Sequence, residues 1–468
     1  MANIKQSKVY DAVVIGSGVS GSFLALELVK SGMEVLLLEA GEFFSRSNFP
    51  QKEIDANSKL YWGGGIEFNT DANIALLRPK VVGGGSIVNQ ALLDRFDDDA
   101  LSSWKSQSGV SFFESGKLDK YYAAAEAELN IETIPEKYRN ENGKIFAEGF
   151  KANGYQYAPL TRAQKNCGFE EGNDCIECLS GCRADSKQSM LITTLKAALG
   201  KGLHIKSLFE VGKIENNGEE VKIHGLYLKK YRETFKARKL ILAAGAIGNT
   251  KLLLSSGFKK KLPALGRNFF THPQFMVLAL FNREISAHKG PFQSLKSADP
   301  NFRKKGFKLE NVFGPPVAIS MLLQGFGSEH MRFMKRLSQM ACIEVAIRDT
   351  NPGIISLDKK GKVRIDKKLN DEDRKRKAAG VEAIQTIFSP QGAEEVFEGR
   401  LPIGLHLMGG LGIGENSETS VVNPEFQIHC QRNIFVADSS IFPNAPGINP
   451  SLTIMALSIK AAQEILRG

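Results

Sequence analysis

The stretch from Val9 to Glu39, VYDAVVIGSGVSGSFLALELVKSGMEVLLLE, decides the fold of this chain. It begins with an apolar, β-branched strand (9–15) and passes through a glycine-rich turn into a helical pattern (22–30). A second apolar strand (34–38) follows and ends on an acid. A strand, a tight turn, a helix and a second strand in this order form the first unit of a dinucleotide-binding fold.

The glycine-rich turn has the residue types that a bound pyrophosphate requires. Gly16 permits the tight turn, and Gly18 lets the pyrophosphate approach the backbone N–H groups at the helix N-terminus. Gly21 allows the helix to pack closely on the strand. Val19 and Ser20 lie within the turn, and we expect them to contact the cofactor as well.

An acid closes the second strand, 18 residues after the last glycine of the turn. Glu39 is expected to accept hydrogen bonds from an adenosine ribose, with Ala40 beside it in the same site. Because an acid disfavours a 2′-phosphate, NADP is the least expected dinucleotide. Strands and helices do not alternate after this point as in a simple NAD enzyme. A long irregular stretch follows, which contains the glycine runs 63–65 and 83–85.

Composition places the chain among folded, globular proteins. It has 468 residues, of which 42% are hydrophobic and 24% charged, and this length predicts two or three domains. No apolar run is long enough to span a bilayer, and residues 1–8 show no secretion signal, so we expect a cytoplasmic protein. The net charge of +10 is read as a solvated basic surface, with peripheral contact to an anionic membrane as the alternative. No nucleic-acid motif accompanies the charge, so nucleic acid is not an expected partner.

Three further motifs carry a family resemblance. The run GGGSIVN (83–89), the run LAAGAIGNTKLLL (242–254) and the run VADSSIFP (436–443), with Asn449-Pro450 after it, resemble the flavin signatures of the glucose-methanol-choline oxidoreductases in the family's order. FAD is the cofactor that this resemblance implies. It assigns to FAD, besides the glycine turn, the residues Gly83, Gly84, Ser86, Asn89, Val211, Ala244, Gly245, Asp438, Asn449, Pro450 and Ser451.

The positions of the motifs imply the fold class and the domain organisation. We expect an α/β protein (α+β overall) with a Rossmann-type FAD-binding domain built from discontinuous segments and a second, sheet-plus-helix substrate domain. The FAD-binding domain is expected over 1–271, with a cysteine-containing insertion at about 100–186, and over 401–468. The substrate domain is expected over 272–400, with strand-like stretches at 275–281, 340–348 and 353–357 and a charged helix from about 371 to 389.

Alcohol oxidation by a flavin needs a group that takes the hydroxyl proton while hydride leaves carbon, and a histidine suits this task. Among the seven histidines, His406 lies in the run GLHLMGG (404–410), which resembles the family element that carries the active-site histidine. Asn449 matches the family's second active-site position, which holds His or Asn. By resemblance, His406 is the base and Asn449 holds the substrate oxygen.

Three other residues bear on the site by the same resemblance. His272 matches an element at the domain junction and is read as structural or cavity-lining. Glu344 is a candidate second acid or base, because it lies within an apolar strand, where a buried carboxyl group is costly unless it has a function or a partner. Members that attach FAD covalently carry a histidine just before the Asn of the first signature, whereas this chain has Val88 there, so non-covalent FAD is expected.

Four of the six cysteines lie close together, and their role is left open. Cys167, Cys175, Cys178 and Cys182 could ligate an iron-sulfur cluster or zinc, although their spacing fits no standard pattern. Reduced or disulfide-linked structural cysteines explain them equally well. The segment 178–187 resembles the long-chain fatty alcohol oxidase branch, whereas other branches place an iron-sulfur cluster in this region.

These observations predict an FAD-dependent alcohol oxidase or dehydrogenase. The proton goes to His406, hydride goes to flavin N5, and the electrons pass to oxygen or another acceptor. The alcohol is a small molecule that could be lipophilic, since apolar residues at 313–326 either line a pocket or pack in the core. Two alternatives remain: a membrane-docked dehydrogenase subunit that needs an electron-acceptor partner and carries an iron-sulfur cluster, and a non-redox flavoprotein lyase of the same fold.

Overall fold

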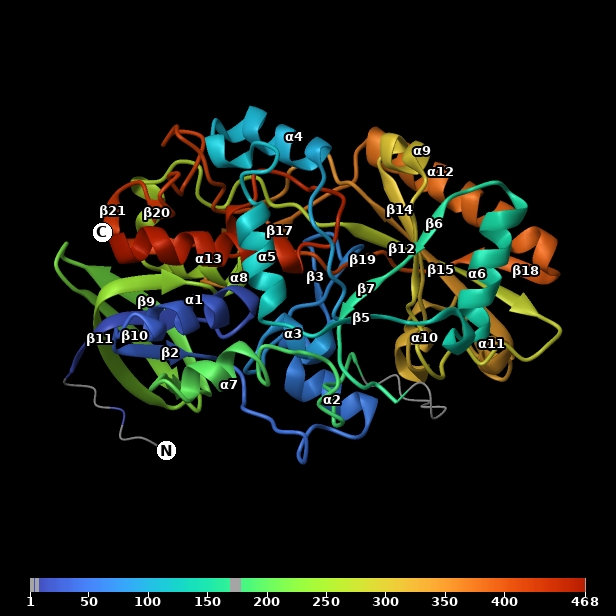
Figure 1. The fold of residues 1–468 in the computed structure, drawn as a ribbon, viewed down its shortest axis with the longest axis horizontal. Helices are drawn as coiled ribbons and strands as arrows, with labels where there is room; N and C mark the ends of the chain where they lie inside the picture. Colours follow the sequence, from blue (N-terminus) through green and yellow to red (C-terminus); the bar gives the residue numbers. More distant parts are fainter. Residues whose placement is uncertain (1–3, 5–7, 169–177, 468) are drawn as a thin grey trace.

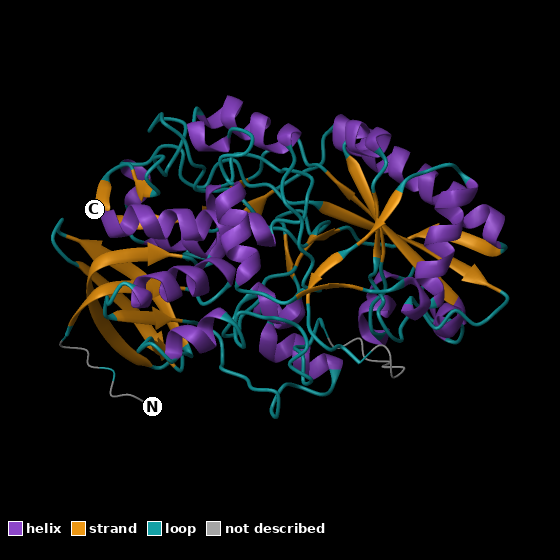
Figure 2. Cartoon of the chain, viewed as in Figure 1, coloured by secondary structure: helices purple, strands orange, loops and turns teal. Residues whose placement is uncertain are grey.

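The structure is a computed structural model that describes residues 4, 8–168 and 178–467. Two large sheets lie side by side along the long axis, on the left and right of Figure 1. Helices and long loops connect and cover them (Figure 2). This is the mixed α/β fold that the sequence predicts, with a Rossmann-like unit followed by a second sheet.

The first sheet is built around the strand that opens the glycine turn. Strand β1 (Val9–Ile15) lies between β11 (Tyr231–Leu242) and β2 (Val35–Leu38) and is parallel to both. At one edge, β8 (His204–Lys206) is parallel to β2. At the other, β21 (Gln431–Val436) is parallel to β11, and β20 (Gln427–Ile428) is antiparallel to β21. Strands β9 (Phe209–Asn216) and β10 (Val221–Tyr227) form an antiparallel meander with the first half of β11.

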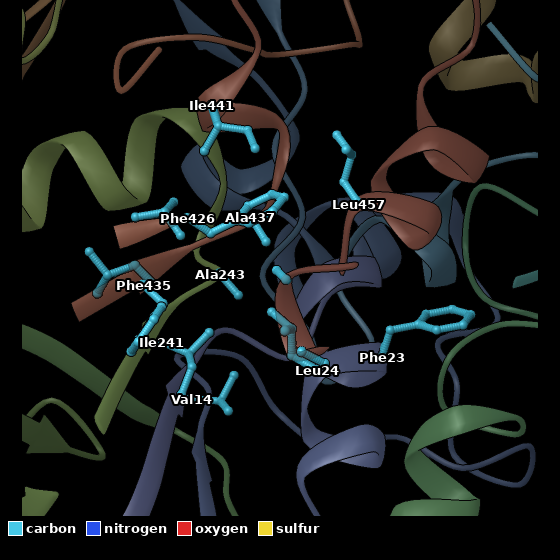
Figure 3. Packing of buried hydrophobic residues seen from close by; sticks show 14 of the residues in the cluster. Val14, Phe23, Leu24, Ile241, Ala243, Phe426, Phe435, Ala437, Ile441 and Leu457 are labelled. Atoms are coloured by element: carbon cyan, nitrogen blue, oxygen red, sulfur yellow. The ribbon is translucent and has the colours of Figure 1, made fainter. Parts of the chain in front are cut away.

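Helix α1 (Val19–Lys30) joins β1 to β2 and packs against α13 (Ser451–Arg467), the last helix of the chain. The apolar residues of α1 are buried on most sides because the helix lies between the sheet and its neighbours. Figure 3 shows part of this core, in which Phe23 and Leu24 of α1 belong to one buried cluster with Val14, Ile241 and Leu457. Segments from both ends of the described chain therefore share one hydrophobic core.

The second sheet contains the longest fully buried strand. All nine residues of β12 (Pro273–Phe281) are buried, which explains its continuous apolar sequence. The path of this sheet is β3-β4-β19-β12-β15-β14-β13-β6, with β18 paired to β12. The bounds of its other strands are Glu67–Phe68 (β3), Ala75–Leu76 (β4), Tyr157–Pro159 (β6), Leu295–Ser297 (β13), Phe307–Asn311 (β14), Met340–Ile347 (β15), Ala393–Glu398 (β18) and Ile403–Gly404 (β19).

Helices α12 (Asp371–Phe388) and α6 (Glu141–Ala152) cover one face of the second sheet, on the right of Figure 1. A capping box between Asn370 and Asp373 starts α12 where the sequence predicts a charged helix. The predicted strand-like stretch at 353–357 forms a hairpin of β16 (Ile354–Leu357) and β17 (Val363–Asp366).

The remaining elements lie mostly between and around the two sheets (Figure 1). They are α2 (Glu53–Leu60), α3 (Gly85–Val88), α4 (Asp98–Ser108), α5 (Asp119–Ala127), α7 (Thr194–Leu199), α8 (Gly245–Ser255), α9 (Pro300–Lys305), α10 (Pro316–Leu322), α11 (Ser328–Met334), β5 (Ile131–Thr133) and β7 (Thr161–Ala163). Among the described residues, no helix combines the length and the apolar character needed to cross a lipid bilayer.

Candidate active site

A cavity of about 520 Å³ extends from the glycine turn of the first sheet to the second sheet. It brings together segments that are far apart in the sequence. The predicted site residues that line it are Gly16, Gly18, Val19, Ser20, Glu39, Ala40, Gly84, Asn89, Val211, Ala244, Gly245, His406, Asp438, Asn449, Pro450 and Ser451. Gly21, Gly83, Ser86 and His272 are not part of the lining, and their contacts are with other parts of the protein.

The two glycine-rich segments touch each other at the wall of the cavity. A Cβ atom added to Gly84, whose φ is +54°, would lie 2.6 Å from the Cα of Gly18. A Cβ atom on Gly21 would lie 1.9 Å from the carbonyl oxygen of Gly16, so only glycine lets α1 pack on the turn. The hydroxyl of Ser86 donates to the carbonyl of Gly83 and so supports the second segment from behind.

Glu39 lies at the end of β2, where the sequence predicts a ribose contact. Its Oε2 accepts hydrogen bonds from the backbone N–H (3.0 Å) and the hydroxyl (2.7 Å) of Ser17, and its Oε1 accepts from the N–H of Gly41 at 2.7 Å. Burial raises the pKa of Glu39, while these donors oppose the rise. Glu39 therefore both holds the turn in shape and lines the cavity.

Asp438 ties the C-terminal motif to the start of α8. Its Oδ2 accepts from the N–H of Gly245 at 2.7 Å and from the side-chain amide of Asn249 at 2.9 Å. Burial raises the pKa of Asp438, and the hydrogen bonds from Ser440, Gly245 and Asn249 lower it. Two predicted flavin motifs thus meet through one carboxyl group.

The sequence analysis did not identify Lys187 as a site residue. Its buried ammonium donates to the carbonyl oxygens of Ile87 (2.5 Å), Asn89 (2.8 Å) and Cys178 (2.5 Å). The first two belong to the 83–89 run, so Lys187 fixes that run to the segment after residue 177. A buried lysine is rare without such partners, but the sequence gives no sign that this lysine is buried.

At the other end of the cavity, two histidines face each other. The Nδ1 atoms of His272 and His406 are 2.9 Å apart, and the rings are nearly perpendicular. The backbone N–H of Gly447 donates to Nε2 of His272 at 2.9 Å, which requires a lone pair on that nitrogen. A neutral His272 therefore carries its proton on Nδ1 and donates to Nδ1 of His406. His406 in turn carries its own proton on Nε2.

His272 is buried and His406 is half-buried at the cavity, and the low pKa of each favours the neutral ring. Burial, followed by the positive charge of Lys308, lowers the pKa of His406 to about 3, while the negative charge of Asp94 opposes the shift. Burial and the neighbouring ring of His406 also lower the pKa of His272. In this resting arrangement, the nitrogen that His406 leaves for a ligand is a hydrogen-bond donor.

Asn449 is held by two carboxylates. Its Nδ2 donates to Oδ2 of Asp94 at 3.0 Å and to Oε1 of Glu310 at 3.4 Å. Both amide hydrogens are thereby used, which leaves Oδ1 to accept a hydrogen bond from a ligand. Asp94 forms a further ion pair with Lys296.

Glu310 and Glu344 form a buried pair on neighbouring strands. They are direct cross-strand partners on β14 and β15, both line the cavity, and their exposures are 1% and 3%. Burial raises the pKa of Glu344, as do the negative charge of Glu310 and a hydrogen bond with it. Lys308 Nζ lies 2.5 Å from Glu310 Oε1 and forms an ion pair with that carboxyl. The raised pKa favours the protonated form of Glu344.

Sequence reasoning singled out Glu344 but missed Asp94, Lys296, Lys308 and Glu310. Glu344 interrupts the apolar run 340–347, whereas Glu310 lies in the mixed stretch FKLENVF (307–313) and does not stand out there. Lys308 and Asp94 carry no such signal, since isolated charges of this kind are usually solvated.

Comparison with known proteins places the chain in a family. Models described as GMC oxidoreductase match residues 57–274 and 350–458. The chain belongs to the GMC oxidoreductase family. It is 28% identical to an uncharacterised GMC-type oxidoreductase of Mycobacterium tuberculosis, covering 97% of this chain and 75% of that protein. It is 26% identical to a long-chain-alcohol oxidase of Arabidopsis thaliana, covering 96% and 67%.

The fold of this GMC oxidoreductase is also that of solved structures. Pyridoxine 4-oxidase from Mesorbium loti superposes with a TM-score of 0.76 at 17% identity, covering 98% of this chain and 99% of the other. A fungal aryl-alcohol oxidase superposes with a TM-score of 0.73 at 14% identity, with 99% of both chains covered. The family resemblance inferred from the flavin motifs is confirmed.

GMC oxidoreductases bind FAD, and the glycine end of the cavity fits that group. The first turn of α1 has no side-chain cap, so its backbone N–H groups remain available to a pyrophosphate. The hydroxyl of Ser20 is buried beside the cavity and has no hydrogen-bond partner in the described part of the chain. A bound anionic group would satisfy these donors.

The cysteines of this GMC oxidoreductase give no support to the iron-sulfur or zinc alternatives. Cys175 lies outside the described residues. Over residues 4, 8–168 and 178–467, no group of three or more His, Cys, Asp or Glu side chains could hold a metal ion. Cys178 and Cys182 make contacts of another kind: Cys178 Sγ accepts from Arg162 at 3.7 Å, and Cys182 Sγ accepts from the N–H of Lys187 at 3.4 Å.

Proposed function

We propose that this GMC oxidoreductase oxidises an alcohol to the carbonyl compound and passes the electrons to oxygen or to another acceptor. The observation that carries the proposal is a single cavity with a glycine-lined cofactor end and, at its other end, His406, Asn449 and the Glu310–Glu344 pair. Bound FAD supplies a hydride acceptor. The similarity to a long-chain-alcohol oxidase supports an alcohol as the hydride donor.

In this proposal, His406 binds the reacting hydroxyl, and Asn449 lies beside it. The alcohol oxygen accepts a hydrogen bond from Nε2–H of His406, the O–H donates to the Glu310 carboxyl, and Asn449 donates to the same carboxyl through Nδ2. The sequence analysis expected His406 to be the base. The hydrogen bond from Gly447 to His272 favours a different role, because it leaves Nε2 of His406 with a proton and without a lone pair.

The Glu310–Glu344 pair is the better candidate for the proton acceptor. When the C–H bond breaks and hydride leaves, the O–H proton moves to the Glu310 carboxylate, and the carbonyl oxygen remains hydrogen-bonded to His406. Lys308 forms an ion pair with this carboxylate, at 2.5 Å from its Oε1. The pair then carries two protons, one of which must leave before the next turnover.

Anaerobic addition of alcohols to the purified holoenzyme tests the proposal. Bleaching of the flavin bands by an alcohol, with formation of the aldehyde or ketone, is expected. Glu310→Gln should slow bleaching, with His429→Ala, which lies in a separate hydrogen bond to Ser420, as a control that does not. Flavin bands that no alcohol bleaches would refute alcohol oxidation and leave a lyase of the same fold. Re-oxidation by air then separates an oxidase from a dehydrogenase.

A further inference from the structure

The second sheet presents a polar and an apolar region to the cavity. Along β12, Gln274 and Met276 line the cavity, two and four residues beyond His272, which contacts His406. Across the sheet, Met276 pairs with Glu344, which pairs with Glu310. The polar groups thus lie toward the histidines.

The apolar region lies further along the same strands. Cys342 of β15 and Val312, just beyond β14, line the cavity there and are joined by a backbone hydrogen bond. Phe313, Ile319 and Leu322 continue this lining. Phe326, which the sequence analysis grouped with them, is 78% exposed and is not part of the lining. A ligand that fills the cavity therefore meets polar groups first and apolar groups next.

Gln274 is a polar residue in this region whose side-chain oxygen forms no hydrogen bond with the described residues. Its side chain is 3% exposed and lines the cavity, and its Oε1 has no hydrogen-bond partner among the residues described. A buried amide oxygen without a partner costs free energy, and native proteins rarely keep one unless a ligand or water satisfies it. Rotation of the terminal amide can bring either Oε1 or Nε2 to the cavity. Gln274 therefore fits a hydrogen-bonding group of the substrate.

The charges around the polar region point to a neutral group. Asp94 and Glu310 are balanced by Lys296 and Lys308, and Glu344 adds no charge while it keeps its proton. A substrate carboxylate or ammonium would disturb this balance in a buried setting, where an unpaired charge is expensive. A hydroxyl donates and accepts without carrying charge, so it matches the amide of Gln274.

We propose that the substrate is an alkyl diol: a reacting hydroxyl at His406 and Asn449, a second hydroxyl one or two carbons away on Gln274, and an apolar chain toward Val312 and Phe313. The inference rests on the proposed alcohol oxidation. Such a diol differs from a plain fatty alcohol, whose second and third carbons would lie against the side-chain amide of Gln274 without forming a hydrogen bond to it.

Turnover gives the first test. The kcat/KM of the holoenzyme is compared for an n-alkanol and for the vicinal and 1,3-diols of the same chain length. The kcat/KM of at least one diol should exceed that of the n-alkanol by about 10-fold or more, which is the usual contribution of a hydrogen bond to a buried polar group. Gln274→Met should abolish the preference, whereas Met276→Leu, in the neighbouring position on β12, should change both substrates alike. An n-alkanol oxidised as well as both diols would overturn the inference and leave alcohol oxidation intact.

Binding without turnover gives the second test. Tertiary alcohols cannot lose hydride, so a tertiary mono-alcohol and the matching di-tertiary diol are titrated into the oxidised holoenzyme and followed by the flavin difference spectrum. The diol should bind about 10-fold more tightly, and Gln274→Met should remove the difference. This result would support the Gln274 subsite even if no alcohol were oxidised. Equal affinities in the wild-type protein would overturn it.

Discussion

At the scale of single residues, the proposed role of His406 depends on which ring nitrogen carries its proton. His406→Ala should reduce the rate of anaerobic flavin reduction by about 10²- to 10³-fold, the usual cost of losing one preorganised donor to a developing carbonyl or oxyanion. The flavin spectrum and the melting temperature should stay close to wild type, since the glycine end of the cavity is separate. Stopped-flow absorbance measures the rate, and an unchanged rate would rule out the assigned role.

Glu344 provides a prediction on pH at the same scale. Its pKa in the folded protein is raised above its unfolded value, so the folded state binds more protons than the unfolded state as pH rises above that unfolded value. The contribution of Glu344 to stability is therefore greatest at low pH and is lost as pH rises toward the folded pKa. Glu344→Gln should flatten this dependence and leave the protein at least as stable at pH 7. Denaturant titrations across pH 4 to 8 measure the free energy of unfolding of both proteins. A wild-type protein that loses no stability relative to Glu344→Gln as pH rises would contradict the raised pKa.

At the scale of elements, Lys187 connects the flavin run to the rest of the chain. Lys187→Met leaves three carbonyl oxygens without their common donor, so α3 and the residues beside it should loosen. FAD affinity should fall by roughly 10-fold or more, while Lys196→Met on α7 should leave it unchanged. Equilibrium dialysis of FAD measures both variants. Unaltered affinity in Lys187→Met would mean that the run holds its shape without the lysine.

A buried ion pair anchors the β16–β17 hairpin. Lys367 and Asp349 are fully buried and 2.8 Å apart, and Asp349 also accepts from the N–H of Thr271, next to His272. Burial raises the pKa of Asp349 and the charge of Lys367 lowers it, and the net pKa is about 6. Lys367→Met should destabilise the protein by about 3–5 kcal/mol because it leaves one buried carboxyl unpaired. The double variant Lys367→Met with Asp349→Leu should recover part of the loss in urea unfolding. A single variant as stable as wild type would show that the pair contributes little.

At the scale of the whole molecule, the sequence predicted what local patterns encode. The strand–turn–helix unit around Gly16, the buried strand β12 and the helix α12 follow from hydrophobic period, glycine spacing and capping residues. The prediction of the second sheet was less complete. Its strands β3, β4, β6 and β19 come from outside residues 272–400 and are only two or three residues long. Such short strands carry no period of their own.

The chemistry of the cavity depends on contacts between distant segments. Asp94 bonds with Asn449 across 355 positions, and Gly447 sets the tautomer of His272 across 175. Neither contact leaves a trace in local sequence. The sequence therefore predicted that His406 lies at the cavity but not which of its nitrogens carries the proton, and the carboxyl pair depends on the pairing of β14 with β15.

The most direct measurement is the visible spectrum of the purified holoenzyme during anaerobic addition of an alkyl diol, repeated for Glu310→Gln and His406→Ala. We predict flavin bands that bleach in step with formation of the carbonyl product in the wild-type protein, and that bleach far more slowly in both variants. Flavin that stays oxidised with every alcohol, or that bleaches at the wild-type rate in both variants, would contradict the alcohol-oxidising site described above.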